Sequence, residues 1–89
     1  MSAVVRQASN LDIHEVPDGY IVYQHEQDRV HYLNDTAAVI FEFCDGKLEA
    51  DDIVGRVMQA FELGPSAHDD IRAGLDSLIK EGLVLLPSK

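Results

Sequence analysis

The side chains that could do chemistry near neutral pH are few and widely spaced. Four histidines are the acid-base candidates: His14, His25, His31 and His68. No two of them stand four residues apart, the helical spacing that brings two imidazoles onto one zinc ion. His25 and His31 flank a predicted turn, where they could approach each other and hold a metal weakly, but half-exposed strand residues are the simpler interpretation. We predict no metal site.

The single thiol stands in an unfavourable place for a nucleophile. Cys44 lies at the end of a predicted helix and precedes Asp45, and both a helix C-terminus and a neighbouring carboxylate raise a thiol pKa. We interpret Cys44 as a packed core residue, with a metal, redox or intermolecular disulfide role as the alternative.

Other catalytic patterns are missing from the sequence. No serine stands in a nucleophile elbow, and neither a phosphate-binding glycine loop nor a dinucleotide fingerprint occurs. The acid pairs Asp51-Asp52 and Asp69-Asp70 are explained by the positive N-terminal ends of predicted helices. We therefore predict no catalytic residue and no cofactor, and the chain is not expected to be an enzyme acting alone.

The composition indicates one small globular domain. The chain has 89 residues, 46% of them hydrophobic and 26% charged, with a formal net charge of -9. Its longest apolar runs are too short to span a membrane, and the first residues lack the apolar centre of a signal peptide. We expect a cytoplasmic protein. The negative charge repels phosphate backbones, so nucleic acid is not an expected partner. The short apolar runs mean that a membrane is not expected either.

The elements that must position these residues begin with a meander. Residues 1–10 show no sustained period and predict a flexible N-terminal arm, so that residues 11–89 form the folded domain. Strands are predicted over 11–16, 20–25 and 30–33, because β-branched and aromatic residues alternate there. Pro17-Asp18-Gly19 and Gln27-Asp28 supply the turns between them.

Three helices are predicted to follow the meander. The first covers residues 35–44, capped by Asn34 or Asp35 and ended by Gly46, and the second covers 50–63. Ser66 is the expected cap of the third, which Gly82 ends. Residues 83–86 then return as a short strand or pack beneath the helices. This order predicts the α+β class, a winged helix-turn-helix with a three-stranded antiparallel sheet followed by three helices.

A winged helix-turn-helix raises the possibility of DNA binding, but the acidic character of the third predicted helix argues against it. It offers only Arg72 and Lys80 as bases. Four acids surround them: Asp69, Asp70, Asp76 and Glu81. An acidic transcriptional regulator with a basic patch elsewhere is left as a rival interpretation.

The last predicted strand, residues 30–33, is a candidate edge for binding a further strand. It is short and apolar and contains no proline, so its unpaired backbone groups could accept a segment of another chain. If the third helix lies beside it, the two enclose a groove. The alternative is that a helix or residues 83–86 cover this edge.

The sequence also resembles the PqqD-like family. The run from Leu33 to Gly46 resembles the family's Leu-Asn-x-Thr-Ala-x-x-Ile-aromatic stretch leading into Asp-Gly, and residues 78–84 resemble its Leu-x-x-x-Gly-Leu close. The resemblance covers about residues 30–84. It departs at Glu49, where the family commonly has a capping Thr, and at Phe41, where Trp is frequent.

This resemblance implies a function. PqqD-like domains, also called RiPP recognition elements, are peptide chaperones with three strands and three helices in natural product biosynthesis. They bind the leader of a ribosomally made precursor peptide between the third strand and third helix and present it to a modifying enzyme, often a radical SAM protein. Carried over by position, the resemblance gives these peptide-binding residues: Val30, His31, Tyr32, Leu33, Arg72, Leu75, Asp76 and Ile79. A monomer or weak homodimer is expected, and a self-associating scaffold protein is the other rival.

Overall fold

The computed structural model describes residues 4–86, which form two antiparallel sheets and three helices. The strands are β1 (Val4–Gln7), β2 (Leu11–Val16), β3 (Gly19–Gln24), β4 (Arg29–Asn34), β5 (Asp45–Glu49) and β6 (Val84–Leu85). The helices are α1 (Asp35–Phe43), α2 (Ala50–Ala60) and α3 (His68–Lys80). Two 3-10 turns, η1 (His25–Gln27) and η2 (Pro65–Ala67), complete the order. The mixed α+β class and the three-helix arrangement are confirmed.

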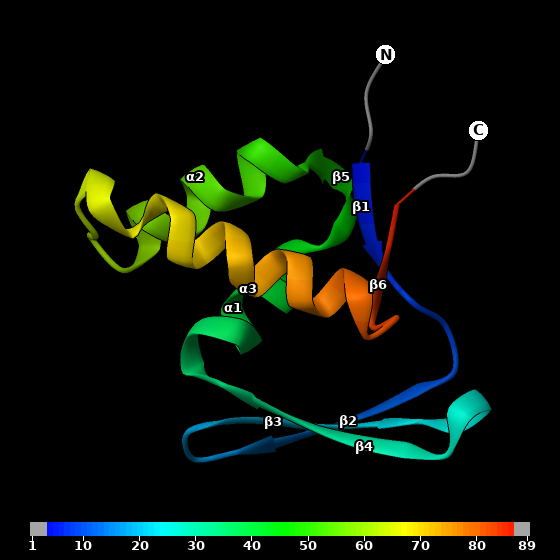
Figure 1. The fold of residues 1–89 in the computed structure, drawn as a ribbon. Coiled ribbons are helices and arrows are strands. Elements are labelled where there is room, and N and C mark those ends of the chain that lie inside the picture. Colours follow the sequence, from blue (N-terminus) through cyan, green and yellow to red (C-terminus); the bar gives the residue numbers. More distant parts are fainter. Residues whose placement is uncertain (1–3, 87–89) are drawn as a thin grey trace.

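The predicted meander is the sheet β2-β3-β4. β2 and β3 are joined by the two-residue turn Pro17-Asp18, which pairs Val16 with Gly19. Their strands stay in continuous register to the far end of the sheet, where η1 leads into β4. Figure 1 shows the three helices on one side of this sheet, and α1 packs against β3 and β4.

The first helix begins where the sequence predicts and ends differently. The Asn34 side chain accepts a hydrogen bond from Ala37 N at 2.9 Å, which satisfies one of the free amides of the first turn. α1 ends at Phe43, and Cys44 N donates to Phe41 O. Gly46 does adopt a positive φ of 84°, but it lies inside β5 and does not end the helix.

The second helix is shorter than predicted. α2 ends at Ala60 because Glu62 takes the left-handed conformation, with φ of 54°. Leu63 N then donates to Met58 O and Glu62 N to Gln59 O, which satisfies the last carbonyls of the helix. The third helix begins at His68, and Ser66 lies within η2, where it makes no capping hydrogen bond.

The expected arm over residues 1–10 is wrong for the part that the structure describes. Val4–Gln7 form β1, the middle strand of the second sheet, and Val5 is fully buried. β1 pairs with β5 on one side and β6 on the other. Two apolar residues are too few to reveal a strand by alternation, and its partners lie about 40 and 80 positions away in sequence.

Residues 83–86 return as a short strand, which is one of the two alternatives that the sequence left open. Val84–Leu85 form β6 and pair with β1, and Figure 1 shows these two strands side by side. The segment therefore does not cover β4. The core lies between the sheets and helices, where Phe41, Ile53 and Leu75 are fully buried. Within the described part of the chain, no helix is both long and apolar enough to cross a membrane.

Candidate functional site

β4 is an edge strand of the meander. It pairs with β3 along its whole length, and across residues 4–86 no strand pairs with its other side. An edge of this kind presents a row of backbone donors and acceptors to solvent. The sequence-based expectation that residues 30–33 lie at an edge is therefore met by the described part of the chain.

The sheet register shows which backbone groups face outward. In a two-residue hairpin the closing pair exchanges both hydrogen bonds, so Val16 and Gly19 bond to each other. Bonding then alternates along β3, and the bond from His25 N to Asn10 O continues the same alternation on the β2 side. It follows that His31 and Leu33 bond to β3. Val30 and Tyr32 direct their N–H and C=O groups away from the sheet.

A groove lies beside this edge. We call it the β4–α3 groove, and its volume is about 430 Å³. Its lining residues are Arg29, Val30, His31, Tyr32, Leu33, Ala37, Gly74, Ser77, Leu78, Glu81 and Leu83. All four β4 residues that we expected at the site are among them.

Small side chains make room in the groove. Ala37, Gly74 and Ser77 occupy the helical side, and Gly74 lies where a Cβ would come within 3.0 Å of Ile40 Cδ1. Val30 and Tyr32 stand at the open edge, 64% and 52% exposed. A large exposed Val and Tyr beside free backbone groups are suited to contact with another chain.

Four side chains of the groove are paired within the protein. Arg29 and Glu81 form an ion pair of 3.8 Å across it, and His31 Nε2 bonds to Gln24 Oε1 at 3.0 Å. Tyr32 donates its hydroxyl to Asp18 O at 3.1 Å, and desolvation together with Asp18 raises the pKa of Tyr32. The groove thus has balanced charge and a largely apolar surface.

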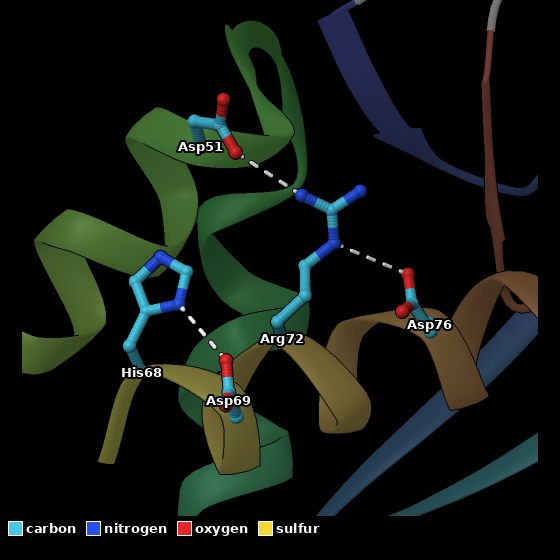
Figure 2. A network of polar contacts seen from close by, with 5 residues as sticks. All are labelled: Asp51, His68, Asp69, Arg72 and Asp76. Carbon is cyan, nitrogen blue, oxygen red and sulfur yellow. Dashed lines mark hydrogen bonds and ion pairs between the residues drawn. The ribbon is translucent and has the colours of Figure 1, made fainter. Parts of the chain in front are cut away.

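The four helical residues expected at the site do not line this groove. Figure 2 shows Arg72 between Asp51 of α2 and Asp76 of α3, with ion-pair distances of 3.1 and 3.3 Å. Leu75 is fully buried in the core and Ile79 is partly buried against it. These side chains connect α3 to α2 and the core, so the structure does not bring them together with the β4 residues in this groove.

The face that does line the groove was missed. Gly74, Ser77, Leu78 and Glu81 follow the helical spacing i, i+3, i+4 and i+7, which places them on one stripe. Gly74 and Ser77 have small side chains and border buried positions, which is a pattern in the sequence that could have indicated a groove beside this face of α3. The sequence alone did not tell which flank of the buried stripe would face β4.

The candidate chemical groups lie elsewhere or are engaged. Cys44 is fully buried, its thiol donates to Ile40 O at 3.2 Å, and burial, with a smaller effect of Asp45, raises its pKa to about 12. His25 bonds to Asp12 at 2.7 Å and not to His31. No three metal-ligating side chains come together among residues 4–86.

Comparisons with known proteins agree on the fold. A family model described as "Coenzyme PQQ synthesis protein D (PqqD)" matches residues 19–84. A solved structure titled "Lasso peptide synthetase B1 complexed with the leader peptide" superposes with a TM-score of 0.73 at 24% sequence identity. The match covers 93% of this chain and 99% of that one, so the two have the same fold over nearly their whole length. No curated protein sequence matches significantly.

Proposed function

The chain belongs to the PqqD family, and on this basis we propose that it is a non-catalytic peptide-binding protein. It captures the leader of a ribosomally synthesised precursor peptide by adding that leader as a strand to β4. It then presents the precursor to a modifying enzyme, such as a radical SAM protein. The observation that carries the proposal is the open edge of β4 beside a groove.

The backbone of β4 supplies the affinity. Val30 and Tyr32 offer two outward N–H and two outward C=O groups, so an added strand gains four main-chain hydrogen bonds without disturbing β3. Such bonds do not depend on the sequence of the peptide. They explain how a small surface holds a flexible segment.

The groove supplies the selectivity. Side chains of an added strand alternate between the two faces of the sheet. Every second one enters the β4–α3 groove, above Leu33 and Leu78 and beside Ala37, Gly74 and Ser77. A groove with small walls and little net charge favours a peptide with apolar residues at alternate positions.

The similarity to the lasso peptide synthetase B1 structure supports a leader as the ligand, since that structure contains one. Arg29, His31 and Glu81 of the groove are each paired within the protein, which supports a role in binding, with the chemistry supplied by the partner enzyme. We propose that the protein acts in the cytoplasm, where precursor peptides are made.

Self-association through the same edge is the rival with a specific observation in its favour. The edge of β4 is as open to a second copy as to a peptide. Two copies would each bring a formal charge of -9, however, and this repulsion opposes dimerisation. We propose a monomer or weak homodimer, which light scattering at several concentrations measures. The same charge opposes a nucleic-acid partner.

Titration with synthetic leader peptides tests the proposal. The panel starts with the leader of any short precursor encoded beside this chain's gene, and scrambled versions of the same composition serve as controls. We expect micromolar or tighter binding of one leader and chemical-shift changes at Val30 and Tyr32. A folded protein that binds no leader, or binds the scrambled peptides equally well, would contradict the proposal.

A further inference from the structure

One buried polar side chain lies at the end of the groove. Among residues 4–86, Gln24 is the one buried polar or charged residue, and it is 5% exposed. It is the last residue of β3, directly opposite Arg29 of β4. A buried amide is retained only where its hydrogen bonds are satisfied.

The Gln24 amide joins the two walls of the groove. Its Oε1 accepts from His31 Nε2 at 3.0 Å, so the His31 ring carries its proton on Nε2. Its Nε2 donates to Glu81 O at 3.3 Å and Gly82 O at 3.4 Å. His31 lies on β4 and Glu81 at the end of α3, and both line the groove.

The end of α3 is shaped to receive this amide. Gly82 N donates to Ile79 O and Leu83 N to Leu78 O, the pattern in which a left-handed residue ends a helix. Gly82 has φ of 79°, and a Cβ there would lie 3.2 Å from Gln24 Nε2. Glycine therefore serves both the turn and the close approach of Gln24.

We propose that Gln24 and His31 are positioning residues that set the separation of β4 and α3, and thereby the affinity of the groove for its peptide. The inference rests on the proposed function and extends it. The other bridge at this end, between Arg29 and Glu81, has both side chains about half exposed and a separation of 3.8 Å. Exposed pairs of this kind restrain geometry weakly, so the buried amide is the principal link.

The separation of α3 from the sheet that carries β4 is measured first in the free protein. Nitroxide labels are attached to H14C on β2 and K80C at the end of α3, both exposed positions outside the groove. Cys44 is buried and stays unlabelled. Gln24→Met removes all three hydrogen bonds at similar volume. Gln7→Met is the matched control, because Gln7 Nε2 also donates to a carbonyl, Phe41 O at 3.0 Å, but on the other sheet.

We expect Gln24→Met to shift or broaden the distance distribution and Gln7→Met to leave it unchanged. The same variants without labels are then titrated with the leader peptide that the wild type binds. Gln24→Met should weaken binding about fivefold or more, since lost hydrogen bonds of this kind have effects of that order. Gln7→Met should stay within about twofold even where it lowers the melting temperature equally.

The outcomes separate the two proposals. Unchanged distances and unchanged affinity in folded Gln24→Met would overturn the positioning role and leave leader binding intact. A wild-type protein that binds no leader would overturn the proposed function, while the distance measurement would still decide whether Gln24 sets the wall separation. If Gln24→Met does not fold, Gln24→Glu replaces it. This variant keeps the acceptor for His31 and loses the donor to Glu81 and Gly82, and the same two outcomes apply.

Discussion

Replacing Tyr32 by proline is the sharpest perturbation of the proposed binding edge. Tyr32 directs its N–H away from β3, so proline at this position removes no hydrogen bond of the sheet. It does remove one donor from the open edge, and its ring projects towards an incoming strand. The fold should therefore persist while peptide pairing is lost at this point.

The magnitude follows from the group left unpaired. A carbonyl of the bound peptide that loses its donor in a partly desolvated groove costs about 1–3 kcal/mol. That corresponds to a loss of affinity of about 5- to 150-fold. The steric effect of the ring adds to it, so we expect the upper half of this range.

The assay is a fluorescence anisotropy titration with the labelled leader peptide, and circular dichroism reports on folding. Ile13→Pro is the matched control, since Ile13 directs its N–H outward from β2, the opposite edge of the same sheet, away from the groove. Tyr32→Phe keeps the backbone donor and should bind nearly as the wild type does. Folded Tyr32→Pro with wild-type affinity, or an equal loss in Ile13→Pro, would refute the reasoning.

Three further predictions follow from the structure. Ser77→Trp fills the groove and should reduce peptide affinity about tenfold or more, whereas Ala73→Trp, on an exposed part of α3 outside the groove, should leave the affinity unchanged. Equal affinities of the two variants in a titration would contradict the assigned face of α3. Leu75→Asp places a charge in the core and should lower the free energy of unfolding, measured by urea denaturation, by about 4 kcal/mol or more. A near-zero change in this free energy would mean that Leu75 is not buried. Because the pKa of Cys44 is raised in the folded protein to about 12, the unfolded chain releases this proton first, and stability should fall as the pH rises from about 9 to about 12. Tyr20 also has a pKa raised to about 12, mainly by its hydrogen bond to Glu42, so the contribution of Cys44 is isolated by comparison with Cys44→Ala. If the unfolding free energies of the wild type and of Cys44→Ala run parallel over this pH range, the prediction for Cys44 is contradicted.

The parts of the fold that sequence predicted well are those set by local chemistry. The turn at Pro17-Asp18 and the cap at Asn34 each depend on residues within a few positions. These two features fix the meander and the start of α1. They also fix where the edge strand β4 lies, which is why the four residues of β4 that line the groove could be named from the sequence.

The parts that sequence did not predict depend on distant partners. β1 is a strand because β5 and β6 pair with it, and nothing in Val4–Gln7 alone requires this. On α3, apolar periodicity indicates the buried stripe but not its orientation around the helix axis. The ion pair between Arg72 and Asp51 of α2 shows that the flank with Arg72 faces the other helix. The opposite flank of α3, with Gly74 and Ser77, therefore lines the groove.

Amide hydrogen exchange along β4 tests the central claim most directly. In the free protein, His31 and Leu33 should exchange slowly because they bond to β3, and Val30 and Tyr32 should exchange quickly because their amides face outward. Saturation with the leader peptide should slow exchange at Val30 and Tyr32 and leave the β2 edge unchanged. Fast exchange at both residues in the saturated complex would contradict strand addition at β4.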